Sequence, residues 1–351
     1  MSLGKLLASP VTTRLLGVNH TGIDWDHLAV ATSRLLPEAQ IWKLFEHSVS
    51  GLGVALCLHH VSRRHRDELT MPASELDNFI EHAMQLERSA SQRWLTVSFD
   101  DGYEDAWHYV VTRARRFPNV EYLLFVCPEK TESQTGFRWD LEVVDHDSPR
   151  DSRVENHRAD LKSVVHLSDA HLATVEQCRY VHLFENAQLG NHTNCHFAPT
   201  ALPLPSALEE LRRSHSDFER LFGPERHFAF PFGGCPSDFD DRHVASIRRA
   251  SNAIIWSTVG RPHFLEQRQP GAVMPRFGVD GRWSASQLAF WIAMRSLRAR
   301  ARGLTPLCPA HRGASPLMHQ VTANLIEELG ARERESASAE NGAAHADDRL
   351  D

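Results

Sequence analysis

Trp94-Leu-Thr-Val-Ser-Phe-Asp-Asp-Gly-Tyr103 is an apolar run that ends in two adjacent carboxylates and a glycine. The run predicts a buried strand, and Gly102 predicts a turn directly after it. Reactive side chains of parallel α/β folds collect at the carboxyl ends of strands. Since neighbouring strand residues point to opposite sides, Asp100 and Asp101 can share one site only if the strand breaks there. Taken alone, the pair is better explained as a solvated Asp-Gly turn.

Similar apolar runs lie on both sides of this stretch and alternate with amphipathic segments. The predicted helices include residues 106–114, which Pro118 ends, and residues 208–222, which Gly223 ends. Strands are predicted at residues 53–58, 94–99, 122–127, 227–230 and 253–256, with a last candidate at 273–279. This alternation favours a parallel α/β architecture.

The chain divides into three parts by pattern. Residues 1–50 lack clear periodicity and are predicted to be an N-terminal extension. The α/β domain is predicted over residues 51–295, with a polar insertion at about 128–179. Residues 296–351 are predicted to be a C-terminal helix followed by a disordered tail rich in Glu, Ser, Ala and Asp.

Composition excludes several classes of protein. Apolar residues make up 42% of the 351 residues, as in globular soluble proteins, and the net charge of -7 includes no strongly basic region that would favour nucleic acid. The six cysteines are scattered without a Cys-x-x-Cys pair, so neither a disulfide framework nor a zinc knot is expected. We find no signal peptide and no transmembrane stretch, so the expected location is the cytoplasm.

A second motif, Asn191-His-Thr-Asn-Cys-His196, carries two histidines four residues apart. Their imidazoles would lie on one face if the segment were helical, the spacing that binds one metal ion. Chance pairs are expected in a chain with 22 histidines, but this is its only His-x-x-x-His. Together with one carboxylate of the acidic pair, these imidazoles would form a two-His-one-carboxylate metal site with open positions. The second carboxylate would then be available as the base of a hydrolase.

A third motif, Phe228-Ala-Phe-Pro-Phe-Gly-Gly234, runs from a predicted strand into a turn. Such a turn can present backbone N–H groups to a developing oxyanion. By itself the motif is much better explained as an ordinary connection between a strand and a loop.

In this order and rough spacing, the three motifs resemble the polysaccharide deacetylase family, also called the NodB homology or carbohydrate esterase 4 family. The resemblance covers about residues 52–280. Further segments agree with it: Leu56-Cys-Leu-His-His-Val61, Gly136-Phe-Arg-Trp139 and Met274-Pro-Arg-Phe-Gly-Val279. The last of these is similar to a Pro-Arg element of the poly-N-acetylglucosamine deacetylase branch.

The resemblance implies a fold, an activity and a set of site residues. The fold would be a distorted (β/α)7 barrel, and the activity removal of an acetyl group from an N-acetylated sugar. Asp100 would be the general base, and the backbone N–H of Phe232 would stabilise the oxyanion. Trp139 and Pro231 would contact the carbohydrate. The metal, usually zinc in this family, would be held by Asp101, His192 and His196.

The chain also departs from the family pattern. Phe230 and Phe232 stand near positions where the family often has Arg and Tyr. The family's late catalytic histidine has no clear counterpart, because the prolines around His311 disfavour a strand there. The general acid therefore stays unassigned.

Three alternatives remain open at this point. The enzyme could remove a formyl group or an O-acetyl group from a lipid-linked or nucleotide sugar. The departures from the family motifs could instead indicate an inert carbohydrate-binding homologue. A scaffold protein with incidental motifs is the third alternative, and the coincidence of several ordered motifs argues against it.

Overall fold

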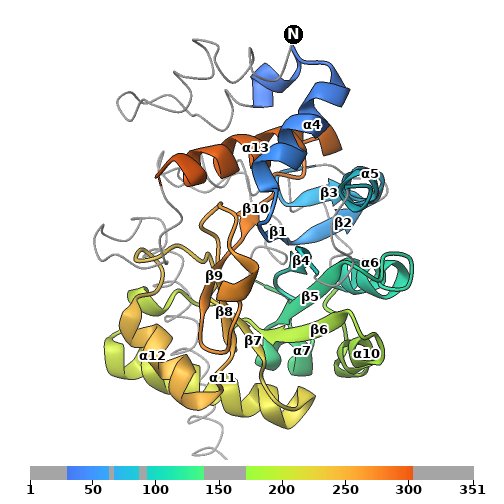
Figure 1. Cartoon of the computed structure of the whole chain (residues 1–351). Helices are drawn as coiled ribbons and strands as arrows, with labels where there is room; N and C mark the ends of the chain where they lie inside the picture. Colours follow the sequence, from blue (N-terminus) through green and yellow to red (C-terminus); the bar gives the residue numbers. More distant parts are fainter. Residues whose placement is uncertain (1–29, 63–66, 87–92, 138–170, 303–351) are drawn as a thin grey trace, which may run out of the picture.

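The computed structural model describes residues 30–62, 67–86, 93–137 and 171–302. Its centre is a parallel sheet of eight strands in the order β10-β1-β4-β5-β6-β7-β8-β9 (Figure 1). The strands are β1 (Val54–Leu58), β4 (Leu95–Phe99), β5 (Glu121–Val126), β6 (Ala187–Asn191), β7 (His227–Ala229), β8 (Ile254–Ser257), β9 (Val273–Pro275) and β10 (Phe277–Gly278). A separate two-stranded parallel sheet is formed by β2 (His60–Ser62) and β3 (Thr70–Pro72).

The two end strands of the large sheet are consecutive in sequence and are separated only by Arg276. Strand β9 pairs with β8, whereas β10 pairs with β1 on the opposite edge. One chain segment therefore closes the sheet into a ring. Counted in this way, the ring has seven strands, and the predicted (β/α)7 barrel is confirmed with its last strand interrupted at Arg276.

Helices surround this barrel (Figure 1). In the view of Figure 1, α5, α6 and α10 lie on one side of the sheet, while α4 lies against α13 at the top. The helices are α4 (Glu38–Val49), α5 (Ala73–Met84), α6 (Glu104–Arg113), α7 (Pro128–Ser133), α10 (Val175–Tyr180), α11 (Leu204–Phe222), α12 (Asp241–Ala250) and α13 (Ala285–Arg302). The predicted domain boundary at residue 295 falls inside α13.

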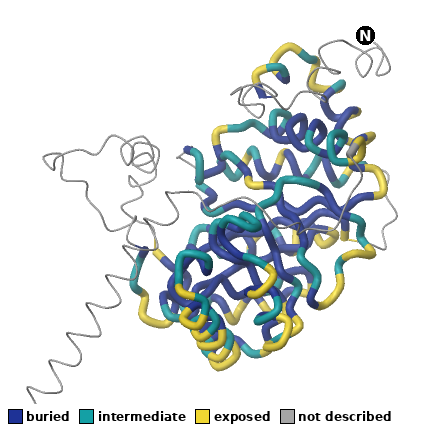
Figure 2. Tube along the Cα trace, turned by 90° about the vertical axis from the view of Figure 1, so that its left-hand side faces the viewer, coloured by how far each residue is buried: buried dark blue, intermediate teal, exposed yellow. Residues whose placement is uncertain are grey.

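The strands are buried on both faces, which explains why their sequences are nearly continuous apolar runs. All five residues of β1 and all six of β5 are buried. Inside the ring, a small cluster fills the barrel with Ala55, Leu123, Phe125, Ala229, Trp256 and Met274. A larger cluster lies between the strands and the helices, and Figure 2 shows exposed residues mostly on the outer segments.

The amphipathic helices follow the predicted periodicity with small shifts. Helix α11 buries Ala207, Leu211, Ser214, Phe218, Leu221 and Phe222, a spacing of three and four residues. It begins at Leu204, four residues before the predicted start, and ends at Gly223 with a φ of 86°. In the part of the chain that the structure describes, no helix is both long and apolar enough to span a membrane.

Gly190 of β6 makes room for an aromatic ring inside the barrel, and this contact can be tested. A Cβ atom at this position would lie 2.3 Å from Cε1 of Phe125 and 3.2 Å from Cβ of His227. We expect Gly190→Ala to lower the free energy of unfolding by about 1–3 kcal/mol, because the overpacked ring must move. Urea denaturation followed by circular dichroism measures the change.

The control is Gly278→Ala in β10, where a Cβ atom would meet nothing within 4 Å. Its unfolding midpoint should stay close to that of the parent chain. Equal midpoints for the two variants would show that Phe125 adapts without cost.

Candidate active site

The acidic pair lies where β4 ends at the rim of the barrel. The N–H of Asp100 still donates to the carbonyl of Leu58, so this residue continues the sheet. Asp101 and Gly102 follow with φ values of 73° and 79°. These two residues have left-handed backbone conformations and break the strand. Such a break is what the sequence analysis required for both carboxylates to face one site.

The two histidines are brought together by a loop and not by a helix. His192 directly follows β6, and both Thr193 and His196 have positive φ values, of 64° and 59°. The loop nevertheless places the two imidazole rings 5.0 Å apart between centroids. The helix considered for residues 192–196 is wrong. The two imidazoles lie close together without it, so the prediction of a metal-binding pair does not depend on a helix.

Both imidazoles turn toward Asp101. Its Oδ1 atom lies 3.5 Å from Nε2 of His192 and 3.2 Å from Nε2 of His196. One ligand atom from each of the three residues lies within 4.8 Å of the others, and all three residues are buried. Asp101, His192 and His196 therefore meet as the sequence predicted.

This donor set fits a divalent cation. Nδ1 of His192 lies 2.8 Å from the carbonyl of Ala229 and donates to it, so the lone pair of Nε2 faces Asp101. Such a carbonyl partner is the usual support of a metal-ligating histidine. Oδ1 of Asp101 is buried and makes no hydrogen bond to any described residue, an arrangement that is costly without a cation.

The second carboxylate of the pair is held by an arginine. Nη1 and Nη2 of Arg276 contact the two oxygens of Asp100 at 2.5 and 2.9 Å, and Nη1 also reaches Oγ of Ser98 at 3.0 Å. Arg276 is completely buried. Sγ of Cys57 donates to Oδ2 of Asp100 at 3.3 Å. Asp100 is thus fixed in orientation, with Oδ2 3.9 Å from Nε2 of His192.

Charges at the site set the protonation of these groups. Burial alone would raise the pKa of Asp100, but the Arg276 guanidinium and then His192 lower it to about 2. Burial likewise opposes ionisation of Asp101, whose pKa is held below its usual range by His196. Burial lowers the pKa of His192 to about 4. Both carboxylates are therefore ionised and His192 is neutral at neutral pH, the forms that bind metal.

The third motif forms a tight turn beside the histidines. Phe232 and Gly233 have φ values of 63° and 69°. Oγ1 of Thr258 donates to the carbonyl of Phe232 at 2.6 Å, which fixes this peptide. The ring of Phe232 lies 5.0 Å from that of His196, and Pro231 is buried in the same turn. The oxyanion role of the Phe232 N–H stays a prediction, as does the substrate contact of Pro231.

Trp139 lies outside the described residues, but its neighbour Phe137 is part of the site. The buried Phe137 ring lies 5.5 Å from the ring of His196 and 5.8 Å from that of Tyr103. Phe137 and Phe232 thus both contact His196 from different loops. Phe137 belongs to the segment Gly136-Phe-Arg-Trp139, in which the sequence analysis assigned a role to Trp139 alone.

Two other residues of the site were also missed by sequence reasoning. His59 follows β1, and the charges of Asp101, Asp100 and His196 all act on it, although burial is the main cause of its lowered pKa. The sequence feature that could have identified His59 is the segment Leu56-Cys-Leu-His-His-Val61, which contains two adjacent histidines. Arg276 lies within the Pro-Arg element named above, and its guanidinium contacts both oxygens of Asp100.

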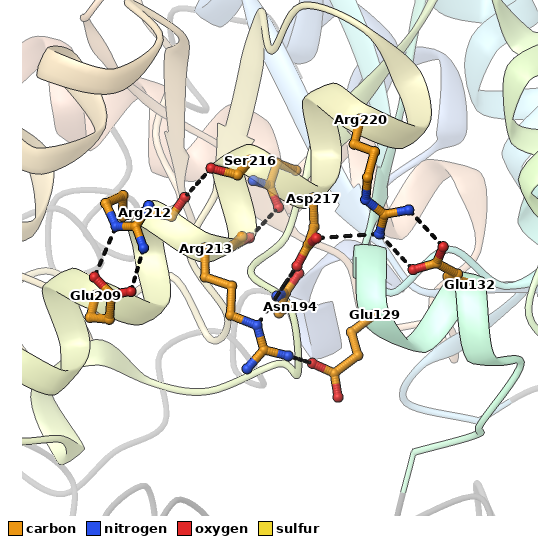
Figure 3. A network of polar contacts seen from close by, with 11 residues as sticks. Glu129, Glu132, Asn194, Glu209, Arg212, Arg213, Ser216, Asp217 and Arg220 are labelled. Carbon is orange, nitrogen blue, oxygen red and sulfur yellow. Dashed lines mark hydrogen bonds and ion pairs between the residues drawn. The ribbon is translucent and has the colours of Figure 1, made fainter.

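A network of hydrogen bonds and ion pairs connects the histidine loop to helix α11 and, through it, to helix α7 (Figure 3). Nδ2 of Asn194, in the middle of that loop, donates to Oδ2 of Asp217 on α11 at 2.8 Å. Arg220 on the same helix forms a two-fold contact with Glu132 of α7 at 2.7 and 2.6 Å. The loop is therefore bonded to α11, which is itself linked to α7.

Comparison with known proteins gives structural likenesses only. No protein-family model and no curated protein sequence matches the chain. Among solved structures, the chain is similar to the deacetylase PplD from Streptococcus pyogenes in complex with acetate, at 12% identity and a TM-score of 0.47, over 68% of this chain and 96% of that one.

Two further solved structures have comparable scores. A polysaccharide deacetylase from Bacillus cereus has 14% identity and a TM-score of 0.45, over 68% of both chains. A de-N-acetylase from Aggregatibacter actinomycetemcomitans has 13% identity and a TM-score of 0.45, over 69% of this chain and 100% of that one.

Proposed function

We propose that this protein is a metal-dependent hydrolase that removes an acetyl group from an N-acetylated sugar of a polysaccharide or of its precursor. The observation that carries the proposal is the meeting of three metal-ligand atoms within 4.8 Å beside a second, separately held carboxylate. A binding protein needs no such base next to a metal site. Amide hydrolysis needs both parts.

Asp101, His192 and His196 would hold the metal. Two imidazoles and one carboxylate suit zinc, and three protein ligands leave positions open. A divalent cation there would polarise the acyl carbonyl and acidify water. The three protein groups need no rearrangement to bind it, because their ligand atoms already converge.

Asp100 would accept the proton of the attacking water. Its pKa of about 2 keeps it ionised throughout the neutral range, and its two contacts with Arg276 fix the direction of its oxygens. The N–H of Phe232 would donate to the oxyanion that forms on the acyl carbon. The left-handed φ of Phe232 and the bond from Thr258 to the carbonyl of Phe232 fix the residue that carries this N–H.

His59 would protonate the departing amine. An amine leaves poorly as an anion, so deacetylation needs a general acid as well as a base. His59 lies at the same rim of the barrel as the carboxylates. Burial lowers its pKa, so the acid role requires the charges of Asp101 and Asp100, which favour the protonated ring, to prevail when the amine leaves. It directly follows β1 and would fill the general-acid role that the sequence leaves unassigned, while His311 lies outside the described residues.

The identity of the acyl group and of the sugar rests on the resemblance of the motifs. Phe137 and Phe232 beside His196 supply apolar surface suited to an acetyl methyl group or to the C–H face of a sugar. The nearest alternative is the same chemistry on a formyl or O-acetyl group of a lipid-linked or nucleotide sugar. A catalytically inert carbohydrate-binding homologue would leave the buried base and its arginine without a purpose.

The direct test is product release from defined substrates. Purified protein loaded with zinc is incubated with N-acetylglucosamine oligomers, an O-acetylated sugar and an N-formylated sugar, and acetate and formate are quantified. We expect zinc-dependent acetate release from the N-acetylated oligomers. Formate as the main product would favour the deformylase alternative, and no product from any substrate would favour the inert homologue.

Metal binding should separate the two adjacent aspartates. Asp101→Asn removes a charged ligand, so we expect its zinc affinity to fall by more than the roughly 10–100-fold that loss of a ligand's supporting partner costs. Asp100→Asn is the matched control, because the same change one residue earlier leaves the three ligands intact. Plasma mass spectrometry after dialysis against a zinc buffer measures both. Equal zinc contents would contradict the ligand assignment.

Turnover should depend on Asp100 independently of metal content. We expect Asp100→Asn to lower kcat for acetate release by about 10²–10⁴-fold, since an amide cannot accept the proton of water. Its zinc content, measured on the same sample, should equal that of the parent chain. A rate near that of the parent would exclude Asp100 as the base.

The role of His59 can be tested with leaving groups of different basicity. His59→Gln should lower kcat/KM for an N-acetylated sugar by about 10²–10⁴-fold, because the amine must be protonated as it leaves. Hydrolysis of p-nitrophenyl acetate should change little, since that leaving group needs no proton. His108→Gln, on the exposed face of α6, serves as the control. Equal losses on both substrates would argue against an acid role.

A further inference from the structure

A second group of polar side chains surrounds a cavity at the opposite end of the barrel. The cavity has a volume of about 660 Å³ and is lined in part by Arg248, Asn252, Arg261, Pro262, His263 and Glu266. Its position follows from the backbone: the N–H of Gly53, just before β1, donates to the carbonyl of His263 at 2.8 Å. It therefore lies near the amino ends of the strands, away from the acidic pair.

Arg261 carries a charge that no described residue balances. Its Nε atom is buried without a hydrogen bond, and burial is the only cause that lowers its pKa. Arg268 and the fully buried Arg276 are paired with Glu121 and Asp100. Arg261 is only partly buried and forms no ion pair with a described residue, so its guanidinium is available to an anion in the cavity.

His263 is a second unpartnered group in the same cavity. Its side chain is 3% exposed, and Nδ1 is buried without a hydrogen bond to any residue in the described ranges. Burial lowers the pKa of His263 to about 4, so the ring is neutral at neutral pH. A neutral imidazole can donate one N–H to an acceptor. Two lining residues on either side of Pro262 thus each have a buried nitrogen without a hydrogen bond to a described residue.

We propose that this cavity binds a small organic anion whose phosphate or carboxylate group pairs with Arg261. A guanidinium offers two parallel donors that match either group. Arg248 adds a second positive charge, against the single carboxylate of Glu266 among the lining residues. The volume is within the range of small-molecule pockets and exceeds what one inorganic ion fills.

The test uses inorganic phosphate and citrate as probes at constant ionic strength, with binding to the full chain measured by isothermal titration calorimetry. We expect saturable binding, weakened at least about tenfold in Arg261→Gln. The matched control is Arg242→Gln on α12, because Arg242 is exposed, pairs with Asp240 and does not line the cavity. Tighter binding of one probe identifies the chemistry of the anionic group.

A second measurement needs no variant and separates this cavity from the metal site, which could also bind anions. Phenylglyoxal modifies accessible arginines, and peptide mass spectrometry reports the extent at each position. Phosphate or citrate should slow modification of Arg261 and leave that of Arg242 unchanged. Unaltered modification of Arg261 at anion concentrations that saturate binding would overturn the proposal, as would equal affinities of the parent chain and Arg261→Gln.

Discussion

The ion pair between Arg276 and Asp100 ties the closure of the barrel to the geometry of the candidate site. Arg276 occupies the seam between β9 and β10, and its guanidinium lies 5.0 Å from the centre of the Phe125 ring inside the barrel. A fully buried cation requires a fully formed anionic partner, and Asp100 supplies it from the end of β4. The backbone N–H of Arg276 meanwhile donates to the carbonyl of Ser257 at 2.9 Å. The last strand cannot leave the seam without unpairing the carboxylate of Asp100.

Much of the fold and the convergence of Asp101, His192 and His196 could be predicted because their signals are local. Apolar runs such as Leu95–Phe99 identify strands by themselves, and their alternation with helices implies parallel pairing. Asp101, His192 and His196 could be named because carboxylate and imidazole are ligand types that occur at strand ends. Their meeting could be predicted without knowing the exact loop shape, since neighbouring parallel strands end on one rim.

The rest could not be predicted because it depends on contacts between distant residues or on strained loops. Arg276 and Asp100 are 176 positions apart, and nothing near either residue indicates its partner. The left-handed residues Thr193 and His196 replace the helix that a four-residue spacing favours, because tertiary contacts such as Asn194 with Asp217 outweigh local preference. His59 and His60 are adjacent in sequence, and no local pattern tells which of the two faces the carboxylates.

The positive and negative charges buried at the candidate site do not cancel, and their sum bears on the reaction proposed for it. Two ionised carboxylates, Asp100 and Asp101, oppose one guanidinium, that of Arg276, while His192 is neutral. The buried centre thus carries one excess negative charge, which disfavours an anionic intermediate by repulsion. A divalent cation would reverse the excess to one positive charge, and the oxyanion of acyl transfer would then neutralise it. The same charges that are costly to bury without a cation would therefore favour a doubly charged cation together with chemistry that develops a single negative charge.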